Sequence, residues 1–235
     1  MIELQHIAKS FEVGGQPIYA LRDTSEIIQS GEYVAIVGPS GSGKSTLLNV
    51  IGCLLRPSEG AYLFKGEDVS QLDDQALSQL RQHQIGFIFQ SFHLVPRLTA
   101  LGNVALPMVF AGVPSSERQL RAKEALESVG LSDRTNHRPN QLSVGQRQRV
   151  VIARAIIMQP SLLLADEPTG NLDTHSGQQI MELLESLNAK GLTMLVVTHD
   201  PNIARRANRI IVLADGQIVK RIKGEEFLSG SPPWS

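Results

Sequence analysis

The sequence has few of the features that mark a secreted or membrane-spanning protein. It contains one cysteine, Cys53, among 235 residues, so a disulfide-stapled fold is excluded and a reducing compartment is favoured. No apolar run approaches the roughly 18 residues that a bilayer-spanning helix needs. The N-terminal residues MIELQHIAKSF lack the charged and apolar regions of a signal peptide. We therefore expect a cytoplasmic protein without direct membrane insertion.

Charged and aromatic residues are also scarce. Charged residues make up 19% and aromatic residues 5% of the chain, which is too little charge for a disordered or coiled-coil protein. The formal net charge of −1 gives no electrostatic reason to expect a nucleic-acid partner. With 42% hydrophobic residues, the chain can build a substantial core as one domain or as two small ones.

Strand-like and helix-like patterns alternate along most of the chain, which predicts an α/β fold with a mainly parallel sheet. Predicted strands cover residues 2–4, 19–21, 25–28, 33–37, 61–65, 85–89, 162–165 and 193–198, and a closing hairpin is centred on 215–216. Predicted helices cover residues 45–54, 73–81, 117–129, 144–158 and 175–189. Strand patterns vanish after residue 95, which indicates a helical insert, and the tail at 229–235 is expected to fray.

A glycine-rich motif follows the predicted strand at 33–37 and opens the next predicted helix. It matches G-x-x-x-x-G-K-S/T and consists of Gly38, Pro39, Ser40, Gly41, Ser42, Gly43, Lys44, Ser45 and Thr46. Its glycines allow backbone N–H groups to form an anion nest at a helix N-terminus. Lys44 can reach the β- and γ-phosphates, and the Ser45 hydroxyl can ligate Mg²⁺. The strand before and the helix after favour a phosphate loop over an ordinary Gly/Ser loop.

Two acids end the apolar run at 162–165. A carboxylate at the carboxyl end of a strand faces the crevice where open α/β sheets bind ligands. Asp166 is placed to hold Mg²⁺ or its water shell, and Glu167 to accept a proton from an attacking water. The alternative is that the two acids merely begin a loop, with Glu167 as a solvated charge.

The segment LSVGQ at 142–146 has two compatible interpretations. Ser143 and Gln146 match a capping box, so the segment can simply start a helix. An exposed helix N-terminus with a serine and Gly145 is also an anion site. Because one phosphate loop is already assigned, a second anion site needs a phosphate from elsewhere, and a second copy of the protein can supply it.

These motifs, followed by Thr198-His199-Asp200, together resemble the nucleotide-binding subunit of ATP-binding cassette (ABC) transporters over essentially the whole chain. The resemblance implies a P-loop NTPase core with a mainly parallel sheet, an antiparallel β subdomain and an α-helical subdomain. One ABC ATPase domain then spans 1–235, with the core at 1–94 and 146–235 and the helical subdomain at 95–145. The segments GPSGSGKSTLLN, FIFQSFHLVPRLTA, PNQLS and ADEPTGNLD look most like the lipoprotein-release and macrolide-export (LolD/MacB-type) group.

The resemblance also assigns roles to residues outside the phosphate loop. Gln90 would contact Mg²⁺ or the attacking water and report ATP occupancy to the membrane partner; otherwise it is a polar residue ending a strand. Asp173 would cross the dimer interface, or else serve as a helix N-cap. His199 would contact the γ-phosphate and orient Glu167, or else be a surface histidine that caps the following helix.

The adenine-stacking residue stays open between two aromatics. Phe11 lies where the family places such an aromatic, and its alternative is a plain core residue. In that case Tyr19 is the stacking candidate. The other five histidines lack ligand spacing, so no metal site is assigned to them.

Two positions depart from the family pattern. Relatives usually have LSGGQ, whereas this chain has Val144 at the third position. Valine does not readily adopt positive φ, so a left-handed backbone there would be strained and would slow hydrolysis. The alternative is that Val144 points away and that Ser143 and Gly145 make the contacts. Gly102 stands where relatives often have glutamate, near the expected transporter contact.

The sequence therefore predicts an ATPase that binds ATP and Mg²⁺ and forms an ATP-dependent homodimer. Each composite site would use 38–46, Asp166, Glu167 and His199 of one chain and 143–146 of the other. The dimer would drive a separate transmembrane permease from the cytoplasmic face of the inner membrane. Two alternatives are a soluble ABC ATPase of translation or DNA repair, and a mechanical module that acts through a permease-like protein without transport.

Overall fold

A computed structural model describes residues 1–227 of the chain, so the tail predicted to fray lies outside the described residues. The chain divides into two compact units. The first unit comprises residues 1–79 together with the chain from residue 193 onward, and the second comprises residues 80–192. Helix α2, Asp74–Gln84, runs from the first unit into the second. No helix within residues 1–227 combines the length and apolar character needed to cross a membrane.

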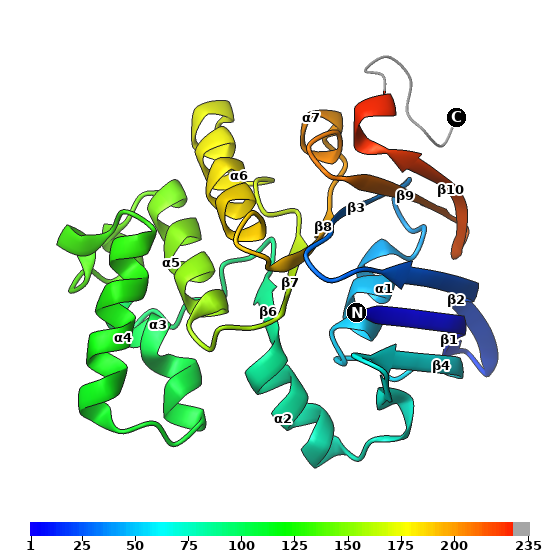
Figure 1. The fold of residues 1–235 in the computed structure, drawn as a ribbon, viewed down its shortest axis with the longest axis horizontal. Helices are drawn as coiled ribbons and strands as arrows, with labels where there is room; N and C mark the ends of the chain where they lie inside the picture. Colours follow the sequence, from blue (N-terminus) through cyan, green and yellow to red (C-terminus); the bar gives the residue numbers. More distant parts are fainter. Residues whose placement is uncertain (228–235) are drawn as a thin grey trace. The chain divides into compact units, whose positions relative to one another are not determined.

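The first unit contains two sets of strands (Figure 1). An antiparallel sheet has the order β2-β1-β4-β5. In the other set, β3 lies parallel to β8 and β9, and β10 is antiparallel to β9. The elements are β1 (Ile2–Val13), β2 (Gln16–Ile28), β3 (Tyr33–Val37), α1 (Lys44–Ile51), β4 (Glu59–Phe64), β5 (Glu67–Asp68), β8 (Thr193–Val197), α7 (Pro201–Ala204), β9 (Arg209–Ala214) and β10 (Gln217–Lys223). Strands β3 and β8 are buried at every residue, as expected for parallel strands covered on both faces.

The second unit pairs two parallel strands with four helices of its own. These are β6 (Ile85–Ile88), α3 (Ala100–Phe110), α4 (Ser115–Ser128), α5 (Val144–Ile156), β7 (Leu162–Asp166) and α6 (Thr174–Asn188). Helices α3, α4 and α5 pack on one another (Figure 1). Helix α5 approaches β6 closely at Gly86: a Cβ built on this glycine would stand only 2.5 Å from the Ala155 carbonyl oxygen, so a larger residue would not fit there.

The α/β character and the helical texture after residue 95 are confirmed, but several elements differ from their predicted extents. The predicted runs at 2–4, 19–21 and 25–28 belong to two long strands, because bulges with register shifts break their alternation. Helix α3 was not predicted individually, since it is apolar almost throughout and contains Pro107. Helix α7 is a single turn and leaves too short a pattern to detect.

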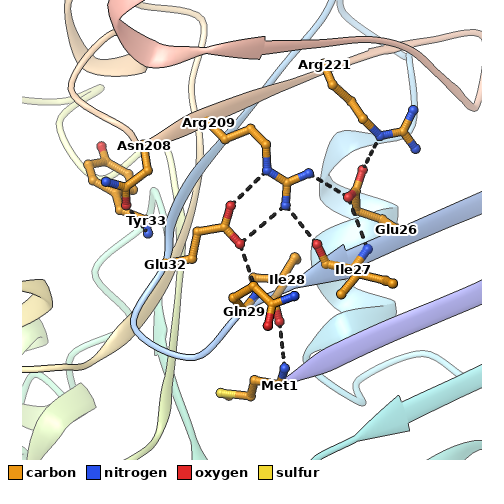
Figure 2. Close-up of polar contacts among 10 residues, drawn as sticks. All are labelled: Met1, Glu26, Ile27, Ile28, Gln29, Glu32, Tyr33, Asn208, Arg209 and Arg221. Atoms are coloured by element: carbon orange, nitrogen blue, oxygen red, sulfur yellow. Dashed lines mark hydrogen bonds and ion pairs between the residues drawn. The ribbon is translucent and has the colours of Figure 1, made fainter.

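A network of ion pairs joins β2 to the β9–β10 hairpin (Figure 2). The Glu26 side chain is only 5% exposed, and its two oxygens accept from Arg209 Nη1 at 2.7 Å and Arg221 Nε at 2.8 Å. Arg209 Nε also donates to Glu32 Oε1 at 2.8 Å. Burial opposes the charge of Arg209, yet the hydrogen bonds to Glu32 and Glu26 outweigh it and raise the pKa of Arg209. The network therefore holds the C-terminal hairpin to the first sheet.

Replacing Arg209 with methionine should strongly destabilise the first unit. The substitution leaves Arg221 as the only ion-pair partner of the buried Glu26 carboxylate and removes the arginine that pairs with Glu32. Breaking a buried pair costs about 3–5 kcal/mol. Arg56→Met removes an exposed pair with Asp74 and should cost less than about 1 kcal/mol. Urea unfolding of both variants measures the difference, and equal midpoints would contradict the role given to the network.

Candidate functional site

The glycine-rich loop lies between β3 and α1, as the sequence predicts. Gly43 is the N-cap of α1 and has a left-handed φ of 99°, which glycine adopts without strain. The Lys44 ammonium group donates to the Gly38 carbonyl at 2.9 Å and to the Pro39 carbonyl at 2.8 Å. The lysine side chain therefore folds back across the loop, where an anion held by the loop would meet it.

Backbone from other strands closes tightly around this loop. A Cβ on Gly38 would stand 2.0 Å from the Leu213 carbonyl oxygen, and a Cβ on Gly43 would stand 2.3 Å from the Ala20 carbonyl oxygen. Both separations are far below van der Waals contact, so neither position admits a side chain. The Ser42 hydroxyl is buried and has no hydrogen-bond partner within the described residues. Buried polar groups are normally hydrogen-bonded, so a bound ligand is a suitable partner for this hydroxyl.

Phe11 and Tyr19 both lie exposed on the β1–β2 ribbon. Directly opposed residues share a face in an antiparallel pair. Phe11 pairs with Ile18 and Tyr19 with Ser10, whereas Lys9 pairs with Leu21. A register shift between Lys9 and Ser10 interrupts the alternation, so the pairing assigns neither aromatic residue to the face of Leu21, whose side chain lies 3.2 Å from a Cβ built on Gly43. Phe11 is 41% exposed, so the alternative that it is a plain core residue is wrong.

The two predicted acids lie at the end of β7 in the second unit. Asp166 is the last residue of the strand, and Glu167 follows with a left-handed φ of 47°. The Gln148 side chain of α5 donates to the carbonyl of Pro168 at 2.7 Å, and Gln148 is only 2% exposed. An uncommon backbone conformation persists where the surroundings fix it, and this buried hydrogen bond fixes the turn that carries Glu167.

Gln90 follows β6 and lies beside the same turn. The Gln90 Nε2 atom and the Cβ of Glu167 are each 3.5 Å from a Cβ built on Gly170. Asn171 Nδ2 donates to the Gln90 carbonyl at 2.8 Å. The second unit thus brings Gln90 and Glu167 together, whereas the sequence places them far apart.

The segment after Gln90 is attached to α5 by two arginines. Arg154 donates to the carbonyls of Phe92 and His93 at 3.0 and 2.7 Å, and burial lowers the pKa of its guanidinium. The Arg147 guanidinium lies 5.1 Å from the centre of the Phe92 ring, within the range of a cation–π contact. Arg147 and Arg154 are seven residues apart, which places them on one helix face. This spacing of the two arginines is the sequence feature that could have indicated their shared contact with the segment after Gln90.

The LSVGQ segment forms the N-terminus of α5. Ser143 is the N-cap, and it forms a capping box in which Gln146 N donates to Ser143 Oγ and Ser143 N donates to Gln146 Oε1. Val144 is the first helical residue, 36% exposed and with no positive φ. The left-handed backbone considered for Val144 is therefore not adopted, and the expected strain is absent.

Asp173 and His199 sit at two further helix starts. Asp173 is the N-cap of α6, and its carboxylate accepts from the backbone N–H of Ser176 at 2.9 Å and from its hydroxyl at 2.7 Å. These hydrogen bonds lower the pKa of Asp173. His199 is exposed after β8, but the N-cap of α7 is Asp200. The capping alternative is thus confirmed for Asp173 and wrong for His199.

The predicted site residues are divided between the two units. The first unit holds Phe11, the loop Gly38, Pro39, Ser40, Gly41, Ser42, Gly43, Lys44, Ser45 and Thr46, and His199. The second unit holds Gln90, Ser143, Gly145, Gln146, Asp166, Glu167 and Asp173. Within residues 1–227 there is no group of three or more His, Cys, Asp or Glu side chains that could hold a metal ion.

The family described as ABC transporter matches residues 21–170. The chain is 51% identical to the ABC transporter ATP-binding protein YknY of Bacillus subtilis, over 96% of this chain and 98% of that protein. The chain belongs to the ABC transporter family. It is an ABC ATPase domain.

Other relatives place the ABC domain in different contexts. The macrolide export ATP-binding/permease protein MacB of Salmonella typhimurium is 50% identical over 96% of this chain, which spans 35% of MacB. The solved structure of the ATP-binding cassette MJ0796 in a dimeric post-hydrolysis state, bound to ADP and Pi, has a TM-score of 0.89 and 47% identity. The structural match covers 97% of this chain and 100% of the MJ0796 chain. The α/β fold inferred from the resemblance is thereby confirmed as the ABC ATPase fold.

Gln148→Leu should destabilise the second unit of the ABC domain. Leucine keeps the apolar volume but leaves the buried Pro168 carbonyl without its donor, at a cost of about 1–3 kcal/mol. Gln178→Leu on α6 removes only an exposed hydrogen bond to Glu182 and should change stability by less than about 0.5 kcal/mol. Denaturant unfolding measures the stability of the two variants. If Gln148→Leu loses no more stability than Gln178→Leu, the turn is held by other contacts.

Proposed function

We propose that this ABC ATPase is the nucleotide-binding subunit of a transporter, forming an ATP-dependent homodimer that drives a separate transmembrane permease. It would work at the cytoplasmic face of the membrane. The observation that carries this proposal is the loop at 38–46. Carbonyl oxygens of β2 and β9 leave no room for a side chain at Gly43 and Gly38, and the Lys44 side chain folds over the loop. Such a cradle suits the phosphates of a nucleotide.

The first unit binds the nucleotide in this proposal. Backbone N–H groups at 38–46 and the ammonium group of Lys44 bind the β- and γ-phosphates. The buried, unpartnered Ser42 hydroxyl supports this assignment, because a bound phosphate would supply an acceptor. Phe11 stacks on adenine, since its ring is exposed on the β1–β2 ribbon and this ribbon contacts Gly43 of the loop through Ala20 and Leu21. His199 contacts the γ-phosphate.

The second unit supplies the proton acceptor and further oxygen ligands. Glu167 accepts the proton of the attacking water, and the Gln148 hydrogen bond keeps its turn in place. The Gln90 amide and Asp166 carboxylate oxygens of this unit suit Mg²⁺, which binds through a few protein oxygens plus phosphates. The Ser45 hydroxyl of the first unit is the further proposed Mg²⁺ ligand. The bound ion would neutralise developing charge on the phosphates.

The start of α5 supports the proposed homodimer. Ser143, Gly145 and Gln146 lie at a helix N-terminus, which favours anions. We propose that this terminus binds the γ-phosphate held by a second copy of the chain, and that Asp173 at the start of α6 lies at the same interface. The starts of α5 and α6 are neighbours, because a Cβ built on Gly145 would stand 3.5 Å from the Ser176 side chain. One surface of a second chain could therefore contact both. The dimeric MJ0796 cassette is consistent with such a pairing.

The permease contact and the type of transport are the finest parts of the proposal. The relatedness to MacB favours macrolide-type export, and the motif resemblance adds lipoprotein release to the proposal. The helical region at 95–145 acts as the subdomain that meets the permease, near the segment 90–99. Asn103, fully buried, donates to the carbonyls of Val95 and Thr99 and accepts from the Val95 N–H. A segment fixed in this way can transmit a force from Gln90.

Glu167→Gln should bind ATP but hydrolyse it at least about 100-fold more slowly, because glutamine cannot accept the proton. Blocked hydrolysis leaves the ATP-bound dimer populated, so light scattering should show twice the monomer mass with ATP and the monomer mass with ADP. Adding Lys44→Ala to this variant should abolish ATP binding and return the monomer mass with ATP. A monomer under all conditions would contradict the composite site.

Val144→Gly should leave turnover and ATP-dependent dimerisation unchanged, because Val144 already has helical backbone geometry. Its only expected effect is a loss of stability of up to about 1 kcal/mol from the helix propensity of glycine. Gly145→Val is the contrasting variant. Its branched side chain would stand at the proposed γ-phosphate contact and should lower dimerisation. Faster turnover in Val144→Gly would show that the valine does hinder closure.

A further inference from the structure

The turn between β9 and β10 touches the phosphate loop directly. Asp215 and Gly216 form this two-residue turn with φ values of 48° and 79°, as in a type I′ hairpin. The N–H of Gly216 donates to the Ser42 carbonyl at 3.1 Å. The turn therefore holds one peptide group of the loop from the side of the C-terminal hairpin.

The same glycine is anchored to β2 through its carbonyl. That oxygen accepts from the Arg22 N–H at 2.8 Å and from the hydroxyl of Thr24 at 3.3 Å, and Thr24 is fully buried. A Cβ on Gly216 would stand 2.9 Å from the Ala20 carbonyl oxygen. The Ala20 carbonyl also lies 2.3 Å from a Cβ built on Gly43. Gly216 and Gly43 thus pack against a single carbonyl of β2.

The hydrogen bond to Ser42 fixes the direction of a neighbouring donor. In a planar trans peptide the C=O and the following N–H point in opposite directions. The Ser42 carbonyl points to Gly216, so the N–H of Gly43 points away from the turn. Gly43 is the N-cap of α1, where the backbone donors of a phosphate loop converge.

We propose that Gly216 is a positioning residue of the nucleotide site, because its N–H aims the Gly43 N–H at the β-phosphate of a bound nucleoside di- or triphosphate. The inference rests on the proposed nucleotide site and deepens it. Gly216 itself does not touch the ligand. Its effect should therefore appear in the recognition of the β-phosphate and not in the recognition of adenosine.

Gly216→Ala tests this role, with Gly66→Ala as a matched control. Gly66 ends another two-residue turn of the same unit, between β4 and β5, with φ values of 54° at Lys65 and 87° at Gly66. A Cβ on Gly66 meets nothing within 4 Å. Both substitutions strain a left-handed turn, but only Gly216→Ala presses on Ala20 and displaces the hydrogen bond to Ser42.

The measurement is displacement of a fluorescent adenine nucleotide by ADP and by AMP, with Mg²⁺ present. Gly216→Ala should weaken ADP binding about tenfold, the effect of one hydrogen bond to a charged group, and leave AMP binding unchanged. Gly66→Ala should bind both like the parent. Parental ADP affinity in folded Gly216→Ala, an equal loss for AMP, or an equal loss in Gly66→Ala would overturn the proposal.

Thr24→Val keeps the test decisive if Gly216→Ala does not fold. Valine preserves the buried volume and removes the hydroxyl that donates to Gly216, so ADP affinity should fall about threefold with AMP unaffected. Parental ADP affinity in this variant would then overturn the proposal. The parent and Lys44→Ala separate the two claims. If the parent does not bind ADP, or if Lys44→Ala binds it normally, the nucleotide site itself is wrong.

Discussion

Close contacts with the backbone of two strands set the conformation of the glycine-rich loop. Carbonyl oxygens of Ala20 and Leu213 lie nearer to Gly43 and Gly38 than any side chain would permit. The loop is therefore enclosed by strands from both ends of the chain, and its donors are fixed before a ligand arrives. A pre-organised donor set avoids the entropic cost of ordering a loop on binding.

The second unit fixes its functional residues by a different device, in which one helix supports several loops. Helix α5 begins at the capping box of Ser143, holds the Pro168 carbonyl through Gln148, and holds the segment after Gln90 through Arg154. A displacement of α5 would therefore move the proposed anion site, the turn of Glu167 and the Gln90 segment together. This arrangement suits a protein whose hydrolysis is coupled to the movement of a partner.

Local features of the structure were predictable from the sequence, and contacts across long distances were not. The phosphate loop, the capping box of Ser143 and the N-cap at Asp173 each depend on a few adjacent residues, and each stood out as a motif. The hydrogen bond from Gln148 to Pro168 spans 20 positions and that from Thr24 to Gly216 spans 192. A polar residue in a buried helix face or strand gives no sign of its partner. For the same reason the left-handed backbone at Glu167 was not foreseen.

Hydrogen exchange of the backbone amides, followed with and without nucleotide, tests the central claim most directly, because the claim concerns backbone donors. In the Glu167→Gln variant, ADP should slow exchange in residues 38–46 and leave residues 143–146 unchanged. ATP should slow exchange in both segments, because the second segment then meets a phosphate held by another chain. Unchanged exchange at 38–46 with either nucleotide would contradict the account.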